Sequence, residues 1–185
     1  MQKRNIQQKI KYLKIEEWNK LISICDNFRD RLILKLLYLS GMRIGEFSQI
    51  KVEDIDFKER FITIPAENTK TKQSRTIYCP AETLSELKAY LKEKKIKKGR
   101  IFDLSIRRIQ QIVKAWGKQA GINWIHPHTL RHSHAVHHLM NKTPIPAIQK
   151  QVGHKRLTTT QIYSNLAPEE IREAYEYSAI KGTNK

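Results

Sequence analysis

Five side chains that could act together on a phosphodiester are scattered along this sequence. Tyr163 is a phenol, and a phenol can attack phosphorus once a base or neighbouring cations compensate for its weak acidity. Arg43 and Arg131 each offer a planar fork that pairs two phosphate oxygens and stays charged at neutral pH. His128 and His154 add hydrogen-bond donors. These residue types therefore predict cleavage of a nucleic-acid strand by a tyrosine nucleophile.

The surroundings of the two arginines favour this interpretation. Arg43 follows Gly41, a helix-ending glycine, so we expect it to open a short helix where backbone N–H groups attract anions. The alternative is a surface arginine that pairs with Glu46, and Glu46 would orient Arg43 in either case. His128 and Arg131 have an i, i+3 spacing on a predicted helix. We expect both to point from one face towards a single phosphate.

Histidines are concentrated in residues 126–138, so a metal site has to be considered. His134 and His138 have the i, i+4 spacing of a helical zinc pair. Neither a cysteine ligand nor the glutamate of an HExxH motif accompanies them. We therefore expect no metal, and we expect most of these rings to be solvated or to line the core. His128 is the exception, with His132 as a further candidate.

Lys70 could supply the proton that a departing 5′-hydroxyl needs. It lies in the polar stretch Pro65–Ser74, between two β-rich segments, and a lysine on such a hairpin tip can act as a general acid. Lys72 could replace it, and either lysine could instead be an ordinary solvent-exposed charge. Tyr163 also has a simpler alternative, which is a buried tyrosine beside Ile162.

The composition indicates a polyanionic partner. Among 185 residues, 35 Lys and Arg outnumber 18 Asp and Glu, which gives a formal net charge of +17. Neutralised phosphates release counterions, so this balance favours nucleic acid, and no apolar run or leader pattern suggests a membrane. We expect a cytoplasmic protein. Cys25 and Cys79 lack ligand spacing and are interpreted as buried thiols without a catalytic role.

Apolar periodicity predicts a mainly helical α+β fold of about one domain. Residues Trp18–Cys25 and Leu32–Leu39 have helical spacing, whereas Phe61–Ile64 and Arg75–Cys79 are β-rich and are expected to pair as an antiparallel hairpin. Further helices are expected at 81–95, 105–119, 128–141, 144–152, 158–164 and 168–180.

The expected domain organisation is simple. Residues 1–14 are basic and lack clear periodicity, so we interpret them as a tether that could lie on phosphates. Residues 15–185 are expected to form one catalytic domain, which includes the C-terminal tail helix 168–180.

The joint pattern resembles the catalytic domain of the tyrosine recombinases, the phage integrase family, from about residue 12 to the C-terminus. The resemblance rests on five segments in the family's order: Ser40–Glu46, Thr69–Arg75, His126–His132, Gln151–His154 and Thr160–Tyr163. It implies a helical domain with a small three-stranded antiparallel sheet. The site it implies consists of Arg43, Lys70, His128, Arg131, His154 and Tyr163.

The resemblance also implies a reaction. The two arginines would grip the scissile phosphate, the two histidines would donate to it and assist proton movement, and Lys70 would act as general acid. Tyr163 would form a 3′-phosphotyrosyl bond and release a 5′-hydroxyl, and a 5′-hydroxyl from a partner duplex would then be ligated. Because the covalent intermediate stores the bond energy, neither ATP nor a metal is implied.

The implied partners are double-stranded DNA and further copies of the chain. Family members assemble as a tetrameric synapse on DNA, often through a C-terminal tail helix, although the tail here could equally dock on its own domain. Accessory DNA-bending proteins would be consistent with the resemblance. Most members also carry an N-terminal DNA-binding domain, where this sequence has only a basic stub. Two alternatives stay open: a relaxase similar to type IB topoisomerases, and a non-catalytic DNA-binding module of the same fold.

Overall fold

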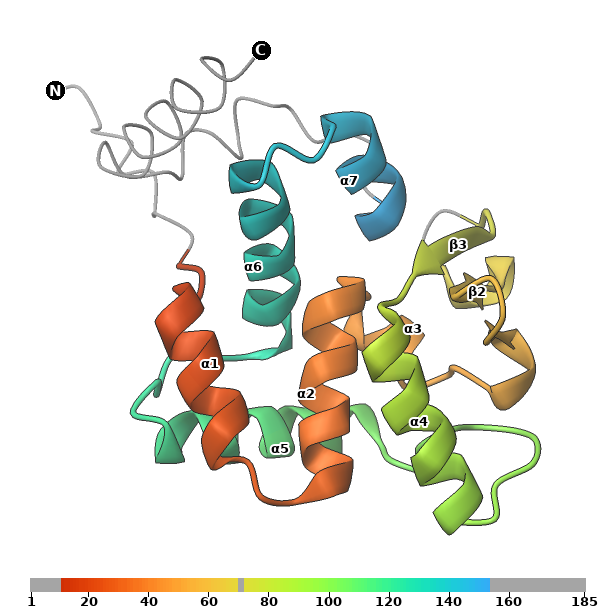
Figure 1. Ribbon diagram of the computed structural model, residues 1–185, viewed down its shortest axis with the longest axis horizontal. Coiled ribbons are helices and arrows are strands. Elements are labelled where there is room, and N and C mark those ends of the chain that lie inside the picture. Colours follow the sequence, from red (N-terminus) through yellow and green to blue (C-terminus); the bar gives the residue numbers. More distant parts are fainter. Residues whose placement is uncertain (1–10, 70–71, 154–185) are drawn as a thin grey trace, which may run out of the picture. The chain divides into compact units, whose positions relative to one another are not determined.

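The computed structural model describes residues 11–69 and 72–153, in which helices surround one small sheet (Figure 1). The α-helices are α1 Ile15–Ile24, α2 Phe28–Ser40, α3 Ile44–Phe47, α4 Ala81–Glu93, α5 Ile106–Gln119, α6 Pro127–Met140 and α7 Ile145–Val152. Two short 3-10 helices are η1 Val52–Asp54 and η2 Ala66–Asn68. Within the described ranges, no helix has the length and apolar character needed to cross a membrane.

The sheet has three antiparallel strands in the order β1-β2-β3, which are Ile55–Asp56, Phe61–Ile64 and Arg75–Tyr78. Ile62, Ile64 and Ile77 are buried, and the side chains that alternate with them point outward. Ile64 pairs with Arg75, so Arg75 lies at the end of the sheet where the hairpin tip begins. The mainly helical fold with a small antiparallel sheet, expected from the sequence, is confirmed.

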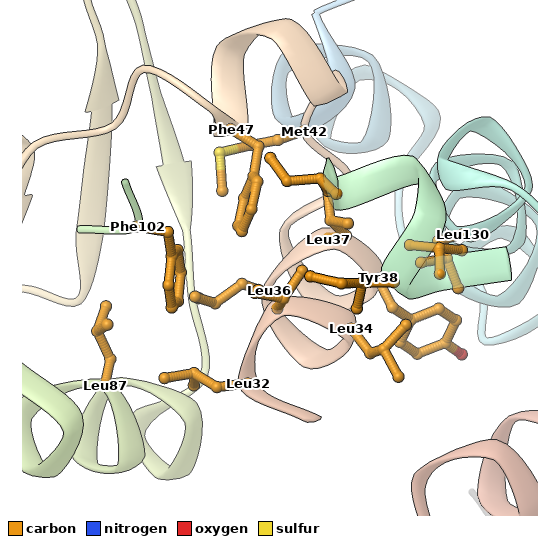
Figure 2. Close-up of a cluster of buried hydrophobic side chains, with 14 of the residues drawn as sticks. Leu32, Leu34, Leu36, Leu37, Tyr38, Met42, Phe47, Leu87, Phe102 and Leu130 are labelled. Atoms are coloured by element: carbon orange, nitrogen blue, oxygen red, sulfur yellow. The ribbon is translucent and has the colours of Figure 1, made fainter. Parts of the chain in front are cut away.

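The core is built around α2, which packs against α1, α4, α5 and α6. Apart from Lys35, residues Leu32–Leu39 of α2 are apolar or aromatic, so they need neighbours on several sides, and most of α2 is buried. Figure 2 shows leucines of α2 between side chains of neighbouring elements, including Phe47, Leu87, Phe102 and Leu130. The helix ends at Gly41, whose φ of +64° lies in the left-handed region. That turn directs the chain into α3.

Helix α6 begins with a capping box. The side chain of His126 accepts the backbone N–H of Thr129 at 3.3 Å, and Thr129 Oγ1 accepts the N–H of His126 at 3.3 Å. Together with Pro127 in the first turn, this cap fixes the start of the helix that carries His128 and Arg131.

Helices α4 to α7 lie within two residues of their expected bounds, for example 106–119 against 105–119 for α5. Helices α1 and α2 begin three and four residues before Trp18 and Leu32, where their apolar spacing starts. The expected helices 158–164 and 168–180 lie outside the described residues. Leu13, which falls in the expected basic tether, is fully buried, and its N–H donates to Ser133 Oγ at 2.8 Å. The packed part of the chain therefore extends back at least to Leu13.

Candidate active site

Arg43 is the N-cap residue of α3 and is held by Glu46. Its backbone N–H donates to Glu46 Oε2 at 2.9 Å, and its Nη1 donates to Oε1 at 2.9 Å. Its Nη2 donates to the carbonyl oxygen of Gly153 at 2.8 Å. The Arg43 side chain is 21% exposed but Glu46 only 2%, so this is not the surface pair of the alternative interpretation. Glu46 orients Arg43 from below the surface.

Glu46 has a second arginine partner, which the sequence did not reveal. Arg75 Nη1 donates to Oε1 at 2.9 Å and Nη2 donates to Oε2 at 2.7 Å, a bidentate pair between β3 and α3. Burial opposes ionisation of Glu46, but the hydrogen bonds from Arg75 and Arg43 outweigh it and lower the pKa of the carboxyl. Glu46 is therefore an ionised, buried centre between two guanidinium groups.

Arg131 lies in α6 and is only 5% exposed. Its Nη1 donates to the carbonyl oxygen of Gly41 at 2.6 Å. Its Nη2 is buried and has no hydrogen-bond partner among the described residues. Burial and the positive charge of Arg43 lower the pKa of Arg131 to about 9, so the side chain stays protonated at neutral pH. A buried cationic nitrogen without a partner is costly, and an anion would relieve that cost.

The fold brings the two predicted arginines together. Arg131 donates to Gly41, two residues before Arg43, and the charges of Arg43, Glu46 and Arg75 all act on Arg131. Two guanidinium groups thus bond the carboxylate of Glu46, and that of Arg131 interacts with it electrostatically. This local excess of positive charge comes from α3, β3 and α6, which are far apart in the sequence.

The end of α7 belongs to the same cluster. Gly153 ends the helix with a φ of +67°, and its carbonyl oxygen accepts the hydrogen bond from Arg43. A Cβ at this position would lie 2.7 Å from both Cζ and Nε of Arg75. Glycine is therefore needed both for the left-handed turn and for the close approach of Arg75. The chain continues directly into His154.

Gln151 is a second residue that sequence reasoning missed. Its Oε1 accepts the N–H of Tyr78 at 3.0 Å, while its Nε2 donates to the carbonyl oxygens of Tyr78 at 2.8 Å and Ser40 at 3.2 Å. The side-chain amide thus occupies both backbone groups of an edge-strand residue and ties α7 to β3 and α2. Its place in the Gln151–His154 segment was the available signal, but the partners could not be derived from it.

His128 is an exposed residue in the first turn of α6, one turn before the buried Arg131. Its ring is 6.3 Å from that of His126 in an edge-on arrangement. His128 and Arg131 therefore share a helix end but differ in burial.

The other histidines of α6 mostly have structural roles, as expected. The rings of His134 and His138 lie 4.4 Å apart, and burial lowers the pKa of His134 to about 3. His137 Nδ1 forms a hydrogen bond with the hydroxyl of Tyr38. Among the residues that the structure describes, no group of three or more His, Cys, Asp or Glu side chains could hold a metal ion.

Three of the predicted site residues, Lys70, His154 and Tyr163, lie outside the described residues. Lys72, the alternative to Lys70, is exposed and has a φ of +54°. At the base of the hairpin tip, Thr69 Oγ1 donates to the carbonyl oxygen of Gln73 at 3.0 Å and accepts the backbone N–H of Gln73 at 3.2 Å. The base of the hairpin tip is therefore closed by side-chain hydrogen bonds.

The chain is similar in sequence to known proteins over most of its length. The model of the phage integrase family matches residues 11–170. Tyrosine recombinase XerA of Pyrococcus horikoshii is 37% identical over 179 residues, which cover 92% of this chain and 62% of the relative. The chain therefore spans about three fifths of the length of such a relative.

Solved structures give the same result. A crystal structure of XerA recombinase has a TM-score of 0.81 and 28% identity, and the match covers 91% of this chain and 65% of that one. XerH site-specific recombinase, bound to palindromic difH substrate in a post-cleavage complex, has a TM-score of 0.75 and 25% identity. That match covers 91% of this chain and 53% of XerH. With a family match over most of its length, the chain belongs to the phage integrase family, as its motifs had indicated.

Proposed function

We propose that this chain is the catalytic domain of a site-specific DNA recombinase, which cleaves and rejoins double-stranded DNA through a 3′-phosphotyrosyl intermediate. One observation supports the proposal most strongly. Arg131 holds a buried Nη2 without a hydrogen-bond partner among the described residues, inside a cluster that already has an excess of positive charge. Such a nitrogen is suited to an oxygen of the scissile phosphate.

The electrostatics of the cluster support this assignment. The carboxylate of Glu46 compensates one of the three guanidinium charges, so a net positive charge remains for a phosphodiester. Negative charge on the phosphate oxygens grows as the nucleophile attacks, and preorganised donors stabilise it most at that point. Loss of one such donor typically costs about 3–4 kcal/mol of transition-state stabilisation. Arg43 and Arg131 are the donors we assign to this role.

The proposed reaction balances without an external energy source. The phenolic oxygen of Tyr163 attacks phosphorus, its proton passes to a histidine such as His128 or His154, and the bond from phosphorus to the 5′-oxygen breaks. Lys70, or Lys72 in its place, protonates the departing 5′-oxygen. Ligation reverses these steps with another 5′-hydroxyl. One phosphodiester is exchanged for one phosphotyrosyl ester and back, so no ATP is required.

The names of similar proteins support the substrate class. XerA is named a tyrosine recombinase, and XerH was solved with its DNA substrate. We accordingly propose double-stranded DNA as substrate and self-association in a tetramer on DNA through the tail helix 168–180. We also propose that the catalytic domain, expected over residues 15–185, begins at least two residues earlier, because Leu13 is buried. Assistance by DNA-bending proteins and a cytoplasmic location remain predictions from the sequence.

A nicked suicide substrate tests the proposal. A pool of duplex oligonucleotides with randomised sequence and one nick is incubated with the protein, and covalent adducts are isolated under denaturing conditions and sequenced. We expect an adduct that is absent in Tyr163→Phe and forms about 100- to 1,000-fold more slowly in Arg131→Ala.

The other outcomes are equally informative. An adduct that persists in Tyr163→Phe would refute the tyrosine as nucleophile. DNA binding by the wild-type protein without any adduct would identify a non-catalytic binding module. Relaxation of supercoiled plasmid of arbitrary sequence, without junction formation between paired sites, would indicate a topoisomerase-like relaxase.

A further inference from the structure

Arg75 is a largely buried arginine to which the proposed reaction gives no role. It is the first residue of β3, and its side chain is only 11% exposed. Both of its terminal nitrogens are occupied by the carboxylate of Glu46, at 2.9 and 2.7 Å. The fork of Arg75 is therefore turned towards Glu46, and its Nε is buried without a hydrogen-bond partner among the described residues. A contribution of Arg75 to the reaction can act through Glu46 and through packing.

The carboxylate of Glu46 is shared between Arg75 and Arg43. Arg43 contributes one side-chain and one backbone hydrogen bond, both at 2.9 Å. Arg75 contributes the bidentate pair, so it both fixes the plane of the carboxylate and compensates its charge. If Arg75 were removed, Glu46 would be left with Arg43 as its side-chain partner. More of the positive charge of Arg43 would then compensate the carboxylate, and less would remain for a bound anion.

Arg75 also contacts the end of α7. Its guanidinium lies so close to Gly153 that a Cβ there would be 2.7 Å from Cζ. The carbonyl oxygen of Gly153 accepts the hydrogen bond from Arg43 Nη2 at 2.8 Å. Arg43, Glu46, Arg75 and Gly153 therefore form a closed ring of contacts. Within the sequence, Arg75 follows the hairpin tip and Gly153 directly precedes His154.

We propose that Arg75 is a positioning residue for the reaction: it holds Glu46 and Gly153 in place, so that Arg43 keeps its guanidinium directed at the scissile phosphate. The inference rests on the proposed function. It predicts that loss of Arg75 slows the cleavage step while DNA affinity changes little, because the guanidinium of Arg75 is bonded to Glu46 and its side chain is only 11% exposed. Loss of a residue that touched phosphate would instead weaken DNA binding and reduce the salt dependence of that binding.

The main test compares Arg75→Met and Arg75→Lys in single-turnover cleavage of the best sequence recovered from the nicked pool. We expect Arg75→Met to cleave about 10- to 100-fold more slowly, as is typical when the support of a reacting group is lost. Arg75→Lys keeps the charge without the fork, so it should recover only part of the rate. The dissociation constant for uncleaved DNA should stay within about twofold, since no phosphate contact is removed.

A pH profile separates positioning from a purely structural role. Burial alone raises the pKa of Glu46, and Arg75 is the first of the groups that lower it. Arg43 bonds the same carboxylate, and Arg131, from α6, interacts with it electrostatically. In Arg75→Met, Glu46 should therefore become protonated as the pH falls, and the cleavage rate relative to wild type should fall with it. In a Glu46→Gln background there is no carboxyl to titrate. The cleavage rate of the double variant relative to Glu46→Gln alone should therefore not change with pH.

Two controls complete the experiment. Lys35→Met removes another partly buried ion pair, with Glu86 at 2.6 Å, away from the cluster, and should cost stability without slowing cleavage. Thermal unfolding identifies variants that fail to fold. If Arg75→Met does not fold, Arg75→Lys decides the matter, and a folded Arg75→Lys protein with the wild-type cleavage rate overturns the inference.

The two hypotheses fail in different ways. An adduct from wild type combined with an unchanged rate and pH profile in a folded Arg75→Met protein overturns the positioning role alone. Absence of an adduct from wild type overturns the proposed function, and the role of Arg75 in it.

Discussion

Replacing Gly153 by alanine should destabilise the protein more than an alanine at another left-handed glycine. Gly153 has a φ of +67°, a conformation that costs about 1–2 kcal/mol for a residue with a Cβ. That Cβ would also lie 2.7 Å from Cζ and Nε of Arg75, so the guanidinium must move. Movement would weaken the charged hydrogen bonds to Glu46, a loss of about 1.5–3 kcal/mol. The free energy of unfolding should therefore fall by about 2.5–5 kcal/mol.

Gly121 provides a matched control. Its φ of +80° imposes the same backbone cost, but the nearest atom to an added Cβ is Lys20 Nζ at 3.8 Å, which is ordinary contact. Gly121→Ala should therefore lose only about 1–2 kcal/mol. Urea denaturation followed by tryptophan fluorescence measures both variants without any need for DNA. Equal destabilisation by the two substitutions would refute the close approach of Arg75 to Gly153.

Three further predictions concern pH, the link to the sheet and anion binding. The free energy of unfolding should fall as the pH is lowered below about 6.5, because burial, followed by the charge of His138, lowers the pKa of His134 to about 3. The unfolded chain then binds a proton that the folded chain does not, at a cost of up to about 1.4 kcal/mol per pH unit for one histidine. Gln151→Ala should lose about 1–3 kcal/mol, since it leaves backbone groups of Tyr78 without their partner. Inorganic phosphate should raise the melting temperature of wild type more than that of Arg131→Ala, because the unpartnered Nη2 is lost.

Each of these predictions has a contradicting result. Acid unfolding that is unchanged in His134→Leu would show that this histidine does not set the slope. Gln151→Ala should be compared with Lys150→Ala, an exposed position on the same helix, and equal stability of the two would remove the link. An equal response of wild type and Arg131→Ala to phosphate would show that Nη2 does not bind anions.

Local signals in the sequence were enough to predict most of the helices and strands. The β2 strand was predicted with its observed bounds, and helices α4 to α7 were predicted within two residues, whereas α1 and α2 begin earlier than their apolar spacing indicated. Periodicity, Gly41 at a helix end and Pro127 at a helix start depend only on neighbouring residues, which is why they could be recognised without a structure. The two-residue strand β1 was too short to leave an alternating pattern, and only the family resemblance implied a third strand.

The cluster around Glu46 could not be derived in the same way. The sequence suggested that Glu46 would orient Arg43, since the two are neighbours on a short helix. It did not indicate the pair with Arg75, which bridges 29 positions, or the hydrogen bond from Arg43 to Gly153, which bridges 110. Hydrogen bonds between distant segments depend on how helices and sheet pack, and residue types alone do not encode that packing.

The sequence by itself determined which chemistry this protein carries, because side-chain types and short motifs define what a guanidinium, an imidazole or a phenol can do. Only the tertiary structure decided how the arginines are used. It buried Arg131 with one nitrogen that has no partner among the described residues, and it paired both terminal nitrogens of Arg75 with Glu46, because burial and hydrogen-bond partners are properties of packing rather than of residue type.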